Sequence, residues 1–275
     1  MTAPNPFLDP AQRDQLYGSP GRLTRRTDAL LTAKTAGRNA ADVIADLAAT
    51  ALHPRPANLA VLDVGCGRGS TTGRLADRLH PETLLAIDAA PALLADARTR
   101  HGARHGLGWV AADFHHLPLP PARLDLAVAA FCLYHSPRPA AAVAEVARCL
   151  RPGGVLIFAT KSADSYADLD ALVVTAGLDV AAASRPSLYQ TFNTKNLLDA
   201  VPAEVEVDQL IHEIHQFRFR DLAHVARYLA TNPKYQLPAA IRGSPELIAL
   251  ALAAAVPDGP VHAHSTVSYA VARRT

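Results

Sequence analysis

The stretch NLAVLDVGCGRG, residues 58–69, decides the fold. Its first half is a short apolar run and its second half is rich in glycine, which is typical of a buried strand that ends in a sharp turn. Glycine has no Cβ atom, so it permits tight turns and lets the backbone approach a ligand closely. We therefore expect a ligand-binding loop after this strand, at the carboxyl edge of a sheet.

Strand and helix patterns alternate around this stretch. Helix-like spacing of apolar residues covers residues 20–52 and ends at Pro54 and Pro56. Strand-like runs at 84–90, 108–112, 124–132 and 155–160 alternate with helix-like segments at 70–80, 91–99 and 139–150. This alternation predicts an α/β fold with a mostly parallel sheet that carries helices on both faces.

Two carboxylates end neighbouring strand patterns. Asp88 ends the second, 19 residues beyond Gly69, where a carboxylate can accept both hydroxyls of a ribose. Asp113 ends the third, with Phe114 beside it to contact an adenine face. Together with the glycine loop these acids favour a nucleoside site, whereas Asp125 begins a strand at the opposite edge and is expected to be structural.

The glycine spacing separates two kinds of nucleotide site. A dinucleotide site uses GxGxxG, whereas residues 63–69 have the pattern DxGxGxG. As VLDVGCGRG, this segment resembles the first motif of class I S-adenosylmethionine-dependent methyltransferases. The resemblance covers residues 59–160, through AIDAA, AADFHHLP, LDLAVAAFCLYH and EVARCLRPGGVLIF, and points to the small-molecule branch of that family.

The resemblance implies a Rossmann-like, seven-stranded, mostly parallel sheet whose last strand is antiparallel. It also implies one domain in four parts. These are an N-terminal helical lid (1–52), a cofactor-binding core (53–160), a substrate cap with late strands (161–260) and a final strand (261–275). In the later parts we expect helices at 164–178, 194–200, 221–230 and 244–256, and strands at 204–219 and 264–272.

S-adenosylmethionine is the cofactor that the resemblance implies, and the residues around its methionine and sulfonium portion are predicted by it. Gly65, Cys66 and Gly67 would pass under the methionine portion, with Asp63 near the ammonium group. Phe131 and Cys132 would flank the sulfonium, and Tyr17 would cover the methionine end.

The resemblance likewise predicts the contacts to the nucleoside. Asp88 would bind the ribose hydroxyls, and Ala89 and Phe114 would touch the adenine. Asp113 would accept a hydrogen bond from the adenine amino group. Gly69 would be a packing glycine that lets the following helix approach the sheet.

Methyl transfer from a sulfonium is an in-line displacement, so an enzyme aligns the nucleophile and removes its proton where necessary. His135, in FCLYHSPRP, is the predicted catalytic base, because imidazole titrates near neutral pH. The alternative is that His135 only hydrogen-bonds its loop. Members of the family commonly carry a histidine pair at this point, where this sequence has Tyr134-His135.

Aromatic residues of the lid and the post-sheet region are predicted to line the acceptor pocket. They are Tyr17, Tyr134, Tyr166, Tyr189 and Phe192. For each of them the alternative is packing in the core of the lid.

Composition excludes several classes of function. Net charge is +2, with 27 basic and 25 acidic residues dispersed along the chain and one tight cluster at Arg22, Arg25 and Arg26, which disfavours a nucleic-acid partner. No apolar run reaches the 18 or so residues of a membrane span, and no secretory signal is evident, so we expect a cytoplasmic monomer or homodimer without a membrane partner. The three cysteines lack CxxC spacing, and His212 and His215 would face opposite sides of a strand, so no metal is expected.

The sequence thus predicts a methyltransferase that acts on an oxygen or nitrogen of a small molecule, such as a specialised metabolite. One alternative keeps the cofactor and changes the reaction, to C-methylation or to a non-methylating step such as cyclisation. A second is a non-enzymatic module that has kept the fold, although its glycine loop and strand-end acids are intact. The glycine spacing disfavours a nicotinamide-dependent oxidoreductase.

Overall fold

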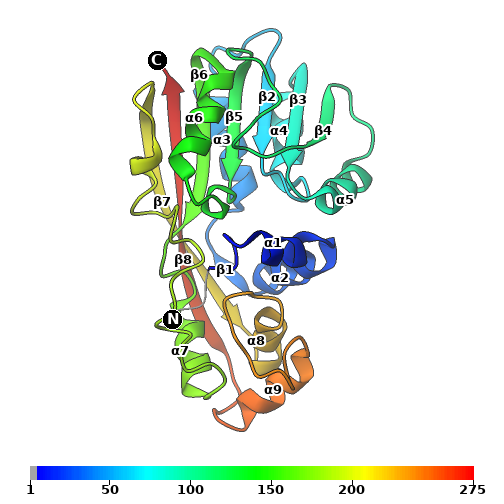
Figure 1. Ribbon diagram of the computed structural model, residues 1–275, viewed down its shortest axis with the longest axis vertical. Helices are drawn as coiled ribbons and strands as arrows, with labels where there is room; N and C mark the ends of the chain where they lie inside the picture. The colour runs from blue at the N-terminus through cyan, green and yellow to red at the C-terminus, as the bar shows by residue number, and fades with distance from the viewer. Residues whose placement is uncertain (1–4) are drawn as a thin grey trace. The chain divides into compact units, whose positions relative to one another are not determined.

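The computed structural model describes residues 5–275, and the chain divides into two compact units (Figure 1). The sheet unit comprises Arg38–Ser162, Thr191–His212 and Val267–Thr275. The helical unit comprises the described residues up to Gly37, together with Ala163–Gln190 and Glu213–Thr266. Each unit is thus assembled from segments that lie far apart in the sequence.

The sheet unit has the predicted α/β topology. Its parallel strands are β2 (Ala60–Val64), β3 (Thr83–Asp88), β4 (Leu107–Ala111), β5 (Leu124–Ala130) and β6 (Leu150–Lys161). The last strand, β8 (Val261–Arg274), pairs antiparallel with β6, from Val155 opposite Arg273 to Lys161 opposite Val267. With β7 (Val205–Phe219) the strand order is β7-β8-β6-β5-β2-β3-β4, which confirms the expected mostly parallel sheet with an antiparallel last strand.

The sheet has one strand more than the seven expected. The additional strand, β1 (Lys34–Ala36), pairs antiparallel with the part of β7 that belongs to the helical unit, Lys34 lying opposite Phe217. The helix pattern over residues 20–52 did not predict it. Gly37 follows β1 with φ of +92°, and a Cβ atom there would lie 2.4 Å from the His215 ring, so the chain turns at Gly37 and the predicted helix is interrupted.

Helices α3 (Ala40–Ala51) and α4 (Ser70–Leu79) cover one face of the sheet unit. Their apolar side chains, including Ile44 and Leu75, pack against alternate residues of the central strands, among them Val128 and Ile157. Figure 1 shows α6 (Pro139–Cys149) over β5 and β6, and α5 (Pro91–His101) beside β3 and β4. Both α5 and α6 begin with a proline, whose fixed φ suits the first helical turn.

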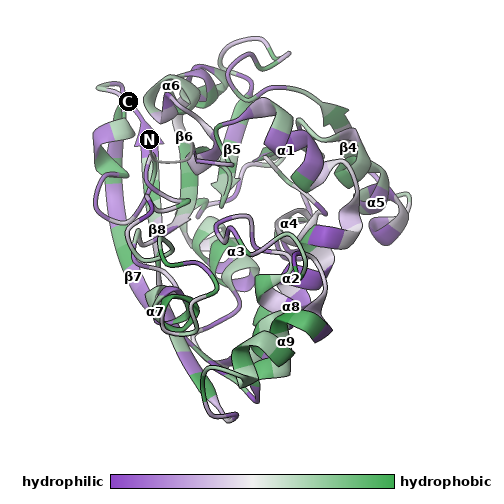
Figure 2. Ribbon diagram, turned by 60° about the horizontal axis from the view of Figure 1, so that its bottom comes forward, coloured by the Kyte–Doolittle hydropathy of each residue, from purple (hydrophilic) through white to green (hydrophobic). Residues whose placement is uncertain are grey.

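Burial explains why the strand patterns were continuous apolar runs. Six of the seven residues of β5 are buried, because helices cover both faces of a parallel sheet. Figure 2 shows β6 as a hydrophobic ribbon, whereas β7 carries hydrophilic stretches. At the amino end of β5, Asp125 accepts hydrogen bonds from the Ala60 amide, at 2.8 Å, and from Arg151, at 2.5 Å, which is the structural part expected of it.

The helical unit contains α1 (Pro10–Tyr17), α2 (Pro20–Ala33), α7 (Ala167–Thr175), α8 (Leu222–Leu229) and α9 (Pro245–Ala253). Its core gathers Phe219, Tyr228 and Ile248, all less than 2% exposed. The helix expected at 194–200 is shorter, a single turn η2 (Leu198–Ala200) that belongs to the sheet unit. Within residues 5–275 no helix is both long and apolar enough to cross a membrane.

Candidate functional site

The glycine loop leaves β2 in a conformation that only glycine adopts readily. Gly65, Gly67 and Gly69 all have positive φ, between +54° and +79°. A Cβ atom on Gly65 would lie 2.4 Å from the Cβ of Cys132, so this glycine lets β2 and β5 end side by side. A Cβ atom on Gly67 would meet nothing within 4 Å. The loop therefore presents open space at its centre.

Gly69 lies close to side chains of α5 and β4. A Cβ atom on it would lie 2.8 Å from Nε2 of His101 in α5 and 2.9 Å from the ring of Trp109 in β4. Gly69 is thus a packing glycine, and its close neighbours are these two stacked rings; approach of the following helix to the sheet as the reason stays a prediction. The glycine loop therefore packs against α5 and β4 at Gly69.

Asp88 lies at the carboxyl end of β3 and holds the glycine loop. Its carboxylate accepts hydrogen bonds from the Gly67 amide at 2.7 Å and from the Ala90 amide at 2.8 Å. Burial raises the pKa of Asp88, against the effect of these two hydrogen bonds. Each carboxylate oxygen has a second lone pair, so the group retains capacity for two further donors such as the hydroxyls of a ribose.

Asp63 is buried, and its carboxylate is hydrogen-bonded to a side chain of the protein. Asp63 is 1% exposed, and its Oδ2 accepts a 2.5 Å hydrogen bond from the Thr72 hydroxyl of α4. Burial raises the pKa of Asp63 to about 7, and the nearby Asp88 charge adds to the effect. Asp63 therefore ties the start of α4 to β2, and its predicted contact with an ammonium group stays a prediction.

The third strand end carries a network that sequence reasoning missed. Asp113 is exposed, and it accepts hydrogen bonds from the backbone amide and from Nδ1 of His115, both at 2.9 Å. Nε2 of His115 lies 2.8 Å from the hydroxyl of Ser136, which follows β5. Burial acts to raise the pKa of Asp113, but the hydrogen bonds from His115 outweigh it and hold that pKa below its usual value.

His115 therefore links the ends of β4 and β5, whereas the neighbouring His116 is 85% exposed. A histidine in a polar loop carries no signal of its own, so the sequence predicts that His115 and His116 are both solvated, which is wrong for His115. The available signal was the spacing Asp113-Phe114-His115, which allows an aspartate to accept from the amide two residues on. The Phe114 ring packs against that of His115, with centroids 4.8 Å apart.

The end of β5 places Phe131, Cys132 and His135 in succession. Phe131 has φ of +56°, a strained conformation for a non-glycine residue, and Lys161 lies 5.8 Å from its ring. The Cys132 thiol is buried and donates to the Val64 carbonyl at 3.3 Å, and burial raises its pKa. It is therefore a packing thiol and not a nucleophile.

His135 is half-buried on a single helical turn, η1 (Leu133–His135). Its Nδ1 lies 3.0 Å from the Cys132 carbonyl oxygen, so in the neutral ring Nδ1 carries the proton and Nε2 the lone pair. The Tyr134 ring lies 4.7 Å away, and the Tyr134 carbonyl accepts from the Thr191 hydroxyl at 3.1 Å. This arrangement fixes the tautomer that a base acting through Nε2 requires.

The predicted acceptor residues fall into both units. Phe192, in the sheet unit, is 0% exposed, and its ring packs edge-on against that of Phe158, with centroids 5.8 Å apart. It therefore belongs to the core and does not contact an acceptor. In the helical unit Tyr166 is also core, packed against Phe217 and Tyr228.

Tyr17 and Tyr189 lie in an aromatic cluster of the helical unit around Arg26. The Arg26 guanidinium donates a hydrogen bond to the Tyr17 hydroxyl and lies 6.0 Å from the Phe7 ring. Burial acts to lower the pKa of Arg26, but Tyr17, Tyr189 and Tyr228 outweigh it and hold that pKa above its usual value. The predicted cofactor contact of Tyr17 stays a prediction.

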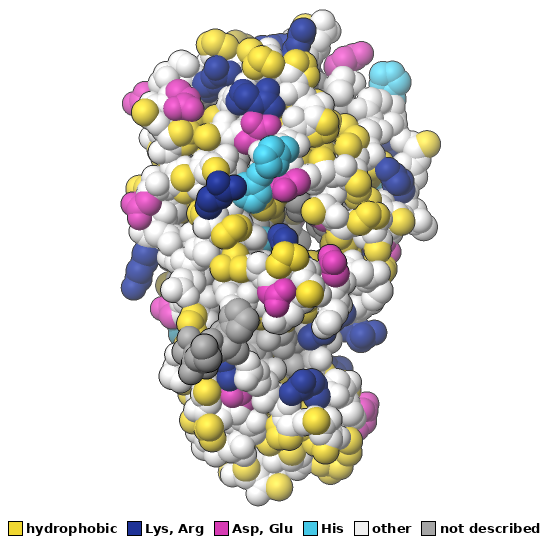
Figure 3. Space-filling view, in the orientation of Figure 1, with side chains coloured by type: hydrophobic (Ala, Val, Ile, Leu, Met, Phe, Trp, Pro, Cys, Tyr) yellow, Lys and Arg dark blue, Asp and Glu magenta, His cyan; other side chains and the backbone are white. Residues whose placement is uncertain are grey.

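Among residues 5–275 no three His, Cys, Asp or Glu side chains are grouped as a metal site. His212 faces the Ser268 hydroxyl at 2.7 Å, and His215 faces Glu213 at 3.2 Å. Basic and acidic side chains are interspersed over the face drawn in Figure 3.

The open loop at Gly67, the carboxylates at the ends of β3 and β4, and the strand order define a Rossmann-like domain suited to a nucleoside. Residues 62–158 match the family model described as a methyltransferase domain. This segment is therefore similar to a methyltransferase domain, and S-adenosylmethionine is the cofactor that the match and the named relatives favour for the sheet unit. The residues present fit this cofactor, because Gly67 leaves open space beside a carboxylate with unused acceptor capacity.

The curated relatives match the middle of the chain. A malonyl-[acyl-carrier protein] O-methyltransferase from Marinomonas sp. (strain MWYL1) is 31% identical over 143 residues, which are 52% of this chain and 51% of that protein. A phthiotriol/phenolphthiotriol dimycocerosates methyltransferase from Mycobacterium leprae is 36% identical over 36% of each chain. The chain thus spans about half the length of the first of these relatives and 36% of the second.

Solved structures share the fold over a greater length. The [4+2]-cyclase SpnF matches with a TM-score of 0.57 and 20% identity, covering 100% of this chain and 98% of its own. A methyltransferase-like protein from Bacillus halodurans matches with a TM-score of 0.54 and 19% identity, over 82% of this chain and 96% of its own. At these identities the likeness concerns the fold alone.

Proposed function

We propose that this chain transfers the methyl group of S-adenosylmethionine to an oxygen or nitrogen atom of a small-molecule acceptor, a specialised metabolite. The observation that carries the proposal is the pairing of Gly67 with Asp88. The Gly67 amide donates a 2.7 Å hydrogen bond to the Asp88 carboxylate, and the space beside Gly67 is open. The matched domain and the named relatives support the reaction class.

S-adenosylmethionine supplies a methyl group that its positive sulfur already activates. The chain's part is to bind, to orient and, where needed, to take a proton. Asp88 would accept the ribose hydroxyls, and Asp113, held by His115, would accept from the adenine amino group beside Phe114. We retain Ala89 as a further adenine contact, and Cys66 and Phe131 as contacts to the methionine and sulfonium end.

His135 is the proposed base for an acceptor whose hydroxyl is weakly acidic. Its Nδ1 proton faces the Cys132 carbonyl at 3.0 Å, so the neutral ring can take the acceptor's proton on Nε2. A carboxylate acceptor is already deprotonated at neutral pH and needs no base. The relatives named as malonyl-[acyl-carrier protein] O-methyltransferases make such a carboxylate the first acceptor to test. Tyr134, Tyr17 and Tyr189 are retained as acceptor contacts.

The dispersed charge and the net charge of +2 support an acceptor that is neither nucleic acid nor membrane, and a cytoplasmic monomer or homodimer is part of the proposal. The alternatives are C-methylation and a non-methylating step such as cyclisation, and the whole-length fold likeness to a cyclase keeps the latter in view.

The test is release of S-adenosylhomocysteine with three acceptor probes, followed by mass spectrometry of the acceptor. The probes are the N-acetylcysteamine thioester of malonate, catechol and octylamine. Release that requires one probe, with a gain of one methyl group on it, supports the proposal. Binding of S-adenosylhomocysteine by calorimetry, with no methyl transfer to any oxygen or nitrogen and a rearranged or C-methylated acceptor, would support the alternatives. Failure to bind it at all would refute both.

A further inference from the structure

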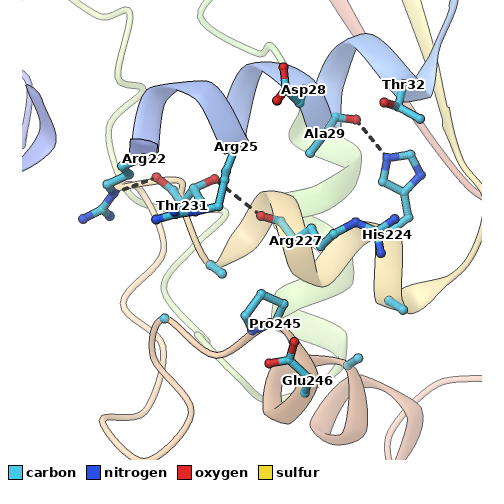
Figure 4. Close-up of a pocket in the computed structure, with 14 residues that line it drawn as sticks. Arg22, Arg25, Asp28, Ala29, Thr32, His224, Arg227, Thr231, Pro245 and Glu246 are labelled. Atoms are coloured by element: carbon cyan, nitrogen blue, oxygen red, sulfur yellow. Dashed lines mark hydrogen bonds between the residues drawn. The ribbon is translucent and has the colours of Figure 1, made fainter. Parts of the chain in front are cut away.

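A cavity lies wholly within the helical unit. Its volume is about 630 Å³, within the range of small-molecule pockets, and it is bounded by α2, α8 and the segment that enters α9 (Figure 4). Small apolar residues form much of its lining: Ala29, Ala223, Ala230, Pro245 and Ala249. Because these side chains are short, the helices leave space where larger residues would close it.

Three arginines give this cavity its charge. Arg22 and Arg25 come from α2, and Arg227 comes from α8. None of the three forms an ion pair with any residue between 5 and 275. Burial lowers the pKa of Arg22, and the like charges of Arg26 and Arg25 lower it further. The three positive charges thus line one cavity, and none of them is in an ion pair within the described residues.

Two acids line the same cavity but do not neutralise it. Asp28 and Glu246 set two negative charges against the three arginines, which leaves one positive charge in excess. Figure 4 shows the Asp28 carboxylate on the side of α2 away from α9, and Glu246 is exposed and accepts from the Ser244 hydroxyl at 3.1 Å. Neither acid forms an ion pair with Arg25 or Arg227, which also line the cavity.

The other polar groups of the wall are already engaged. Nε2 of His224 lies 2.9 Å from the Ala29 carbonyl, and burial lowers the pKa of His224, so the ring is a neutral donor to the backbone. Arg22 donates through Nε to the Thr231 carbonyl at 3.1 Å, which fixes its guanidinium at the rim. These contacts engage His224 and hold Arg22 at the rim of the cavity.

An adjoining cavity extends the positive character. It has a volume of about 330 Å³, shares Arg22 and Ala230 with the first, and adds Arg242, which donates to the Leu237 carbonyl at 2.9 Å. The two other cations of its lining are ion-paired, Arg185 with Asp179 and Lys234 with Asp170. Unpaired positive charge is therefore concentrated along α2 and its neighbours.

We propose that this cavity is a binding site for a small amphipathic anion, with a phosphate or carboxylate headgroup between Arg25 and Arg227 and an apolar stem over the alanine lining. Guanidinium groups bind both headgroups through paired hydrogen bonds, and the excess positive charge of the lining favours an anion over a neutral ligand. The site goes beyond the proposed function, since it shares no residue with the cofactor site.

The test is calorimetry on the full chain saturated with S-adenosylhomocysteine, so that the cofactor site is filled. The probes are hexyl phosphate and hexanoate, with hexanol as the neutral analogue of the same stem. We expect saturable binding of at least one anion, with one site per chain, and at least tenfold weaker binding of hexanol. The anion that binds more tightly identifies the headgroup.

Variants separate the site from general charge effects. Arg25→Gln with Arg227→Gln should weaken anion binding at least tenfold, and Ala249→Phe should weaken it by filling the cavity. Arg100→Gln is the matched control, because Arg100 is an exposed arginine of the sheet unit and should leave binding unchanged. Anion binding that is absent, or that Arg100→Gln weakens as much as the double variant does, would overturn the proposal. Since S-adenosylhomocysteine affinity is measured separately, this failure is distinguishable from failure of the proposed function.

Discussion

Replacing Asp88 tests the cofactor site most directly. Asp88→Ala removes the carboxylate that accepts from the Gly67 and Ala90 amides, at 2.7 and 2.8 Å, and that is proposed to bind two ribose hydroxyls. Hydrogen bonds to a charged group are worth roughly 1.5–3 kcal/mol each, but water replaces part of them, so we expect a loss of about 1–3 kcal/mol in S-adenosylhomocysteine binding. This corresponds to an increase in Kd of roughly 5- to 150-fold.

The assay is isothermal titration of S-adenosylhomocysteine into each variant, with circular dichroism melting to show that it is folded. Asp88→Asn keeps the shape and one oxygen acceptor, so it should lose less affinity than Asp88→Ala. Asp77→Ala is the control, because Asp77 is an exposed carboxylate of α4 that pairs with Arg104. Unchanged affinity in Asp88→Ala, or an equal loss in Asp77→Ala, would refute the assignment of Asp88 as the ribose-binding group.

Three further changes have defined outcomes. Gly65→Ala should lower the free energy of unfolding by about 1–3 kcal/mol in urea titrations, because of its positive φ and the 2.4 Å approach to Cys132, and wild-type stability would contradict the packing argument. The pKa of Asp63, raised to about 7, means that the folded state binds the extra proton between about pH 4 and 7. Stability should therefore fall as pH rises through that window, by at most about 1.4 kcal/mol per pH unit, and Asp63→Asn should remove this slope. His135→Gln should lower kcat with an alcohol or phenol acceptor by roughly 100-fold or more while leaving S-adenosylhomocysteine affinity and carboxylate methylation nearly unchanged, and an equal loss with both acceptors would exclude the role of a base.

The sequence predicted the sheet unit well because its signals are local. Apolar runs between glycine and proline define the buried strands, and strand-helix alternation leaves a parallel sheet as the main solution. Asp88 could be placed at a strand end for the same reason, since position along a strand fixes position at the sheet edge. The antiparallel pairing of β8 with β6 was reached through family resemblance and not through the residues alone.

What failed depended on distant contacts. Strand β1 is three residues long, and only its pairing with β7 stabilises it, so the helix-like pattern on both sides concealed it. Phe192 resembled a pocket residue because it is an aromatic side chain in an irregular segment, yet the packing of Phe158 places it in the core. His115 became part of the site through a hydroxyl 21 residues further on.

The sequence by itself determined the class of fold and the position of the glycine loop, because both rest on local patterns of strands and turns, and the resemblance of that loop to a family motif pointed to the cofactor. Only the tertiary structure decided the state of the groups around them. Burial raised the pKa of Asp63, a backbone carbonyl fixed the tautomer of His135, and the packing of α2 against α8 gathered arginines beside a cavity. Solvation and charge depend on which segments meet in space, and no local pattern of residues specifies that.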